Sequence, residues 1–288
     1  MSQFTSNIFR TALGCAVVFF GALPSFAQTN PASTVESKTQ SPAARDAENT
    51  KKWSVYWGWN RSNYSNSDIR FWGEGHDVTF SNVQASDRQT EVNADNLFGT
   101  YFNPSLFTIP QYNLRVAYQL NDDTAVALNL DHMKYVMNQD QTVQVNGTIS
   151  NLTQSGTKKL TEDYLTFEHT DGLNIVSIEV EKQKRIDIFG PSLPTRIFVF
   201  AGLGIVIPKS NVGLGFMNRA RNDEWHLAGY SVAAGTGIEM DLYKDFFFRT
   251  AYRLGYVNLP DVLTSSQGDK ASHHFTYNEI LIAAGMRF

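Results

Sequence analysis

The sequence predicts an all-β protein whose antiparallel strands close into a barrel, and three observations favour this fold class. From residue 53 onward, apolar residues recur at every second position, which is the period of a β-strand rather than of a helix. The opposite face carries Gly, Ala and Ser with sparse charges, residues that suit a narrow and packed barrel interior. Short turns alternate with longer connections, as in an up-and-down arrangement of strands.

The first 27 residues have the features of a secretory signal peptide. The first ten residues carry one positive charge and no acid, an apolar stretch follows at 11–23, and the small residues Ser25 and Ala27 precede a cleavage site. The apolar stretch is shorter than the roughly 20 residues that a membrane-spanning helix needs. We therefore expect residues 1–27 to be removed and the polar, aperiodic residues 28–52 to form a flexible tail.

Composition excludes several classes of function. Cys15, the single cysteine, lies in the predicted signal peptide, so we expect no disulfide, Cys-ligated metal or Cys nucleophile afterwards. Removal of Arg10 with the signal changes the net charge from −4 to −5, which is too acidic for nucleic-acid binding. No phosphate-binding loop, nucleophile elbow or zinc-protease signature is present. We expect no cofactor and no metal.

Ten stretches show the alternating pattern and are predicted strands. They are Trp53–Tyr64, Gln111–Leu120, Thr124–Met137, Gln141–Ser150, Leu160–His169, Leu173–Lys184, Arg196–Ile207, Trp225–Leu242, Phe246–Tyr256 and His274–Phe288. Residues 65–110 are interpreted as one long outer segment. Two strand-like pieces within it, Asp68–Trp72 and Asp77–Asn82, raise the count to twelve if they join the barrel. Either even number places both termini at the same end of the barrel.

The last predicted strand carries a further pattern. Counted back from the end of the chain, an aromatic terminal residue is preceded by apolar residues at every second position. The residues are Phe288, Met286, Ala284, Ile282 and Ile280. This pattern resembles the terminal signal of Gram-negative outer-membrane proteins. The resemblance implies that residues 53–288 form a transmembrane β-barrel in the bacterial outer membrane, and that the barrel-assembly machinery pairs with this strand during insertion.

This location sets the expected topology and partners. Both termini, the tail 28–52 and the short turns 121–123 and 243–245 are then periplasmic, while residues 65–110 are outside. Outer-membrane lipids and lipopolysaccharide become the expected surroundings, and a closed barrel has no need of a second copy. A soluble periplasmic sandwich that binds a ligand is the alternative interpretation, because a tightly packed core shows the same alternation.

Charged residues on the small-residue face predict an ion network inside the barrel. Five side chains fall on this face or next to it, and sparse charges of both signs are able to pair there. They are Arg249, Arg253, Glu239, Glu279 and Arg287.

Barrel size and polar motifs limit the function. Ten strands leave little free bore, because wide aqueous channels need about sixteen. We therefore expect a structural, surface-recognition or narrow-pore role rather than general porin activity or catalysis. The alternative is a hydrolase acting on lipid A or phospholipid acyl chains, in which a histidine, a carboxylate and a hydroxyl cooperate. The candidate catalytic residues are His132, His169, Asp171 and Ser62.

Overall fold

The computed structural model describes residues 51–288 except 104, 107, 108, 187, 191 and 223. The predicted signal peptide (1–27) and nearly all of the predicted tail (28–50) lie outside the described residues. Most of the described chain is β-strand, and its helical part is short: α2 (Ala94–Asn96) continued by η1 (Leu97–Tyr101). No described helix is long and apolar enough to cross a membrane.

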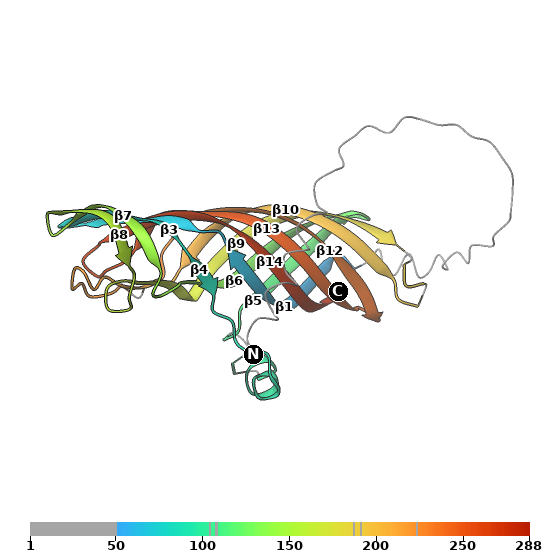
Figure 1. Ribbon diagram of the computed structural model, residues 1–288. Helices are drawn as coiled ribbons and strands as arrows, with labels where there is room; N and C mark the ends of the chain where they lie inside the picture. The colour runs from blue at the N-terminus through green and yellow to red at the C-terminus, as the bar shows by residue number, and fades with distance from the viewer. Residues whose placement is uncertain (1–50, 104, 107–108, 187, 191, 223) are drawn as a thin grey trace, which may run out of the picture. The chain divides into compact units, whose positions relative to one another are not determined.

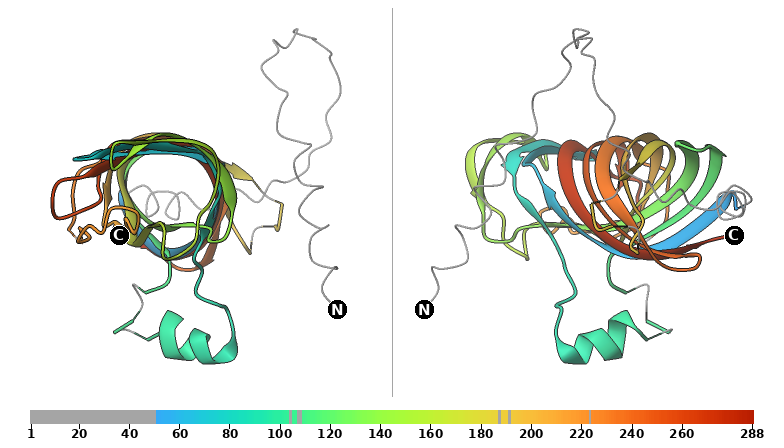
Figure 2. Two further views of the ribbon diagram at one scale, coloured as in Figure 1. Left: turned by 60° about the vertical axis from the view of Figure 1, so that its left-hand side comes forward. Right: turned by 90° about the vertical axis from the view of Figure 1, so that its right-hand side faces the viewer.

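Eight strands of the described chain form a closed antiparallel ring (Figure 1; Figure 2, left). Around the ring they are β1 (Trp53–Tyr64), β5 (Tyr112–Asn121), β6 (Thr124–Met137), β9 (Thr166–Ile186), β10 (Thr195–Pro208), β12 (Gly229–Tyr243), β13 (Phe246–Leu263) and β14 (Lys270–Arg287). β14 pairs with β1 from Ser54↔Arg287 to Tyr64↔Tyr277 and closes the ring. The prediction of an antiparallel β-barrel is confirmed.

The two ends of the barrel domain meet at this closure. The backbone N–H of Phe288 donates to the carbonyl of Trp53 at 2.9 Å, and the N–H of Trp53 donates to the carbonyl of Phe288 at 3.1 Å. The closing pair therefore extends as far as Trp53 and Phe288. Closure matters because an open strand edge presents unpaired N–H and C=O groups, which are very unfavourable in lipid.

At one end of the ring the sheet continues outward. β2 (Ser67–Gly73) pairs with the start of β14, and β3 (His76–Val83), β7 (Thr142–Ile149) and β8 (Leu152–Lys159) follow in that order. Two short strands, β4 (Ala85–Asp87) and β11 (Asn211–Gly213), pair with β6 and β9. We call this the extended end. The opposite end, with Trp53, Phe288 and the turns after β5 and β12, is the turn end.

The ring has fewer strands than the ten predicted because two predicted strands are not separate members of it. Gln141–Ser150 corresponds to β7, which pairs with β3 and β8 outside the ring. Only the last four residues of the predicted strand Leu160–His169 are strand, and they join Leu173–Lys184 in one strand, β9, while residues 160–165 are turn or irregular. The predicted turn between them is a bulge: Gly172 has a φ of +135°, and the β6–β9 register is shifted there. A left-handed φ is typical of glycine in a bulge as well as in a turn.

The stretch at 65–110 is not one long loop. The two strand-like pieces noted in the sequence are β2 and β3, and they form a hairpin with Gly73 opposite His76. This hairpin pairs with β14 only at residues 270–272, beyond the point where β1 leaves β14. It therefore lengthens the sheet at the extended end and does not widen the ring to twelve strands.

Aromatic rings fill the barrel interior by lying over glycines of the neighbouring strand. Four directly paired positions show this: Phe198–Gly237, Phe200–Gly235, Phe247–Gly285 and Tyr277–Gly255. A Cβ atom on Gly237 would lie 2.4 Å from the Phe198 ring and 2.2 Å from the carbonyl oxygen of Thr250. The small residues that marked the interior face in the sequence thus provide the space that these rings occupy.

This packing predicts the effect of adding side-chain volume inside the ring. Gly237→Val should lower the free energy of unfolding by about 1–3 kcal/mol, because the new methyl groups displace the Phe198 ring and the backbone of β13. The measurement is urea unfolding of the protein in phospholipid vesicles. Ala234→Val, on the exposed outer face of the same strand, is the matched control and should leave the midpoint unchanged. Equal midpoints for the two variants would contradict this account of the packing.

Candidate functional site

The interior of the ring contains a network of buried ion pairs. Arg115 on β5 contacts Glu179 at 3.1 Å and Glu181 at 2.9 Å, both on β9. From the other side of the interior, Arg249 on β13 donates to Glu181 and, at 3.0 Å, to Glu239 on β12. All five side chains are nearly inaccessible to solvent. Glu181 is therefore shared by two arginines that come from well-separated strands.

A second group lies around Arg253, which has three carboxylates around it. Its guanidinium is 3.0 Å from Glu179, 3.3 Å from Asp131 and 3.4 Å from Glu279. Asp131 also accepts a hydrogen bond from the amide of Asn60 at 2.5 Å. Because Glu179 also contacts Arg115, the two groups form one continuous network.

The network reaches the turn end through Glu239. Arg287 contacts Glu239 and, at 2.7 Å, Asp241. Arg196 contacts Asp241 at 2.7 Å and lies 4.0 Å from Glu239. These last pairs are less buried than the rest, because Arg287 and Asp241 line the opening of the ring.

The charges of the network nearly balance. In the described chain the ion pairs given above join five arginines to six carboxylates. Balance is required because a buried charge without a partner is strongly destabilising. The five predicted interior residues, Arg249, Arg253, Glu239, Glu279 and Arg287, all take part. The prediction did not include Arg115, Arg196, Asp131, Glu179, Glu181 and Asp241.

Aromatic rings support the arginines of this network. The guanidinium of Arg249 lies 3.5 Å from the ring centroid of Phe198, and that of Arg253 lies 5.1 Å from Phe200. Arg287 is 4.7 Å from the Phe247 ring. These are the same rings that lie against glycines of the neighbouring strands, so each one is close to both a glycine and a cation. Such contacts are stabilising when the cation is desolvated.

Little empty space remains in the network. The cavity bounded by Arg115, Glu181, Glu239 and Arg249 has a volume of about 20 Å³. That is room for about one water molecule. Between these four residues the turn-end interior is therefore a packed, charged plug.

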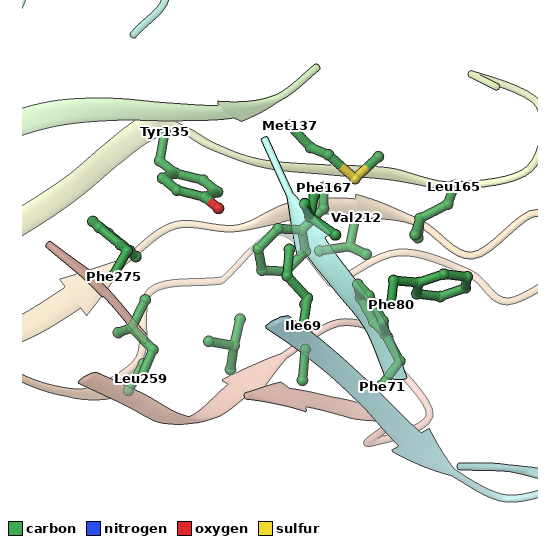
Figure 3. Packing of buried hydrophobic residues seen from close by; sticks show 14 of the residues in the cluster. Ile69, Phe71, Phe80, Tyr135, Met137, Leu165, Phe167, Val212, Leu259 and Phe275 are labelled. Atoms are coloured by element: carbon green, nitrogen blue, oxygen red, sulfur yellow. The ribbon is translucent and has the colours of Figure 1, made fainter. Parts of the chain in front are cut away.

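The extended-end half of the interior is filled by apolar side chains instead (Figure 3). The Phe71 and Phe167 rings meet edge to face at 5.4 Å, and Tyr135 stacks on Phe275 at 4.8 Å. These residues are fully or almost fully buried. The β2–β3 hairpin supplies part of this core, so it closes the interior as well as lengthening the sheet.

A short chain of polar groups crosses the apolar core. The His169 and His273 rings are 3.4 Å apart between their Nε2 atoms. Nδ1 of His169 lies 2.8 Å from the Ser210 hydroxyl, and Nδ1 of His273 lies 3.4 Å from the Ser67 hydroxyl. All four residues are buried. His169 and His273 are 104 positions apart, so the sequence carried no local signal of their contact.

Among the predicted hydrolase residues, Ser62, His132 and His169 have described side chains, and each of the three contacts a group outside the predicted set. The Ser62 hydroxyl contacts the sulfur of Met133 at 3.3 Å, and Nδ1 of His132 lies 2.8 Å from the side-chain oxygen of Asn174. His169 is held in the buried polar chain described above. The side chain of Asp171 lies outside the described residues. No group of three or more His, Cys, Asp or Glu side chains in the described chain is arranged to hold a metal ion.

The outer face of the ring is apolar, in contrast to the charged interior. Large exposed apolar side chains lie on every second position of the ring strands, among them Leu203 (70% exposed) and Ile178 (63% exposed). The residues of the terminal pattern, Ile280, Ile282, Ala284, Met286 and Phe288, all lie on this face. Exposed aromatics gather at the turn end: Trp53, Tyr243, Phe246 and Phe288. A charged interior, an apolar belt and an aromatic girdle together define a transmembrane barrel.

The chain folds as a transmembrane β-barrel of the kind found in the outer membranes of Gram-negative bacteria. No protein-family model matches it, and no curated protein matches it. Among solved structures it is similar to the outer-membrane protease OmpT of Escherichia coli, with 7% identity, a TM-score of 0.40, and coverage of 82% of this chain and 97% of that chain.

Two further similar structures are OprG of Pseudomonas aeruginosa and Ail of Yersinia pestis. OprG has 13% identity and a TM-score of 0.36, and the match covers 83% of this chain and 96% of OprG. Ail has 12% identity and a TM-score of 0.30, and the match covers 83% of this chain and 99% of Ail. All three TM-scores are below 0.5. The assignment of a transmembrane barrel rests instead on the charged interior and the apolar outer face of this chain.

The ion network predicts a large cost for removing one cation. Arg249→Met should lower the free energy of unfolding by about 3–5 kcal/mol, because Glu181 and Glu239 each lose a partner in a desolvated interior. Urea unfolding in phospholipid vesicles measures the change. Lys182→Met removes an exposed cation next to Glu181 in the same strand and should have no measurable effect. A loss of stability no larger than that of this control would show that the interior tolerates the imbalance.

Proposed function

We propose that this outer-membrane barrel does not conduct solutes and serves as a membrane anchor for a recognition surface at its extended end. The closed interior is the observation that supports the proposal. The turn-end half contains a charged plug whose cavity is about 20 Å³, and the extended-end half contains an apolar core. Eight strands enclose just enough space for side chains, which agrees with both halves being filled.

The recognition surface that we propose is the ribbon β3–β7–β8. β8 consists largely of exposed polar residues, and no described strand pairs with its other edge. An unpaired edge offers N–H and C=O groups to an extended segment of a partner protein. Two lysines at the end of the strand are held in place: Lys159 pairs with Asp140 at 2.7 Å, and Lys158 lies 4.2 Å from the ring centroid of Tyr164.

We infer that the extended end faces the outside of the cell and the turn end faces the periplasm. Short turns at one end and longer structure at the other are the usual asymmetry of outer-membrane barrels. The turn end has the two-residue connection between Asn121 and Thr124 and that between Tyr243 and Phe246, whereas the extended end carries β2, β3, β7 and β8.

The absence of conduction is tested in planar lipid bilayers. The purified protein should produce no conductance steps of the size that a general porin gives in the same apparatus, because no water-filled path runs through the ion network. A porin added afterwards to the same bilayer is the positive control. Porin-sized steps that depend on the concentration of the protein would overturn the proposal.

The orientation is tested by labelling engineered cysteines in intact cells with a membrane-impermeant maleimide. Thr153→Cys on β8 should react in intact cells, whereas Lys244→Cys in the turn after β12 should react only after lysis. Both positions are exposed, so access to the reagent decides the outcome. The reverse pattern of labelling would place the β8 surface in the periplasm and exclude surface recognition.

A further inference from the structure

A segment between β4 and β5 leaves the barrel wall and projects sideways from it (Figures 1 and 2). It spans residues 88–109 and contains α2 and η1, and we call it the lateral segment. Its helical part begins with a capping hydrogen bond from the N–H of Asn96 to the side chain of Asn93 at 2.8 Å. It does not belong to the sheet that surrounds the apolar core.

Hydrogen bonds fix both ends of the lateral segment to the wall. Gln111 donates to the carbonyl of Arg88 at 3.2 Å, and Lys134 donates to the carbonyl of Ile109 at 2.8 Å. Just before the segment, Asp87 accepts from the N–H of Ser62 at 2.9 Å. The position of the lateral segment along the barrel axis is therefore fixed.

Arg61 shows where this position lies relative to the lipid-facing residues. This residue lies on the outer face of β1, opposite Ile280 of the lipid-facing pattern. Its guanidinium donates to the carbonyl of Thr90 at 3.0 Å and to the hydroxyl of Tyr101. A cation on the outer wall is unfavourable in lipid unless polar groups surround it. The lateral segment supplies those groups at the edge of the apolar belt.

Aromatic contacts connect the segment to the belt itself. Trp59, one position further into the belt on the same face of β1, pairs in register with Ile282. Its ring lies edge to face with Tyr101 at 5.6 Å and with Phe102 at 5.7 Å. The lateral segment thus starts from the wall at the level of residues that face lipid.

Large apolar side chains cover the remainder of the lateral segment and have no cover within the described chain. The exposed fractions are Phe98 74%, Val92 68%, Phe102 58%, Ile109 52% and Leu106 39%. A cluster of this kind is unfavourable in water and marks a surface that contacts lipid or protein. Because these side chains continue the lipid-facing belt through Trp59, lipid is the occupant that the geometry favours.

We propose that the lateral segment lies in the membrane interface, with its exposed apolar side chains among the lipids of the leaflet on the extended-end side. Interfacial segments bind in this way when apolar side chains reach the boundary between headgroups and acyl chains. With the orientation proposed above this is the outer leaflet. The inference needs only that the protein is an outer-membrane barrel, and it holds whether or not β8 recognises a partner.

The test measures the depth of single nitroxide labels in phosphatidylcholine vesicles by electron paramagnetic resonance. Phe98→Cys and Val92→Cys are labelled separately in the full chain with Cys15→Ser. We expect both labels to collide readily with oxygen, which concentrates in lipid, and to lose collisions with a water-soluble nickel chelate. Both residues are highly exposed in the structure, so neither variant removes a core contact, and heat-modifiable gel migration verifies the folded barrel.

Two matched labels set the scale. Leu203→Cys, on the apolar outer face, gives the values for lipid, and Gln267→Cys, in the exposed turn between β13 and β14, gives the values for water. Values near those of Leu203 for either segment label support the proposal. Values near those of Gln267 for both would overturn it and indicate that the segment stands in water, where a protein partner would have to cover it.

Discussion

A ring of eight strands leaves an interior that side chains fill almost completely, and every charge placed there must find an opposite charge within the same small space. The structure meets this requirement because single carboxylates each pair with two arginines. Glu181 serves Arg115 and Arg249, Glu179 serves Arg115 and Arg253, and each arginine reaches across to strands that are not its neighbours. The network therefore joins opposite walls of the barrel as well as balancing charge.

The same residues fill the volume of this interior and position its charged groups. Because glycines lie against Phe198, Phe200 and Phe247 in place of larger residues, the interior has room for those rings and for the arginines close to them. The extended-end half uses no charges and fills its space with rings such as Phe71 and Phe167. Two different kinds of packing thus fill the two halves of the same interior.

The period-two pattern predicted the barrel and the outward face of β14 because each depends on the alternation of side chains along one strand. The same pattern could have predicted further interior residues. Glu179 and Glu181 alternate along the strand with Ile178 and Val180, which face outward. Contacts between strands that are far apart in the sequence have no such local pattern. The meeting of His169 with His273 depends on which strands face each other across the interior, and no local pattern records that.

The strand count was overestimated for a related reason. Alternation shows that a stretch is extended, but not which strand it pairs with, so β7 looked like a member of the ring. The Asp-Gly pair at 171–172 was typical of a turn, yet Gly172 lies within a 21-residue strand. The lateral segment was also missed, because its apolar residues have no period and its position depends on Arg61, far from most of it in sequence.

The backbone pairing of Trp53 with Phe288 has a consequence for biogenesis. β1 and its partner β14 lie at opposite ends of the barrel domain in sequence, so the ring stays open until the chain has been made through β14. Until then β1 and β14 have open edges and apolar faces, a combination that favours aggregation. Contacts of such long sequence separation also form slowly. The unfinished chain therefore requires protection from water and from other copies until closure.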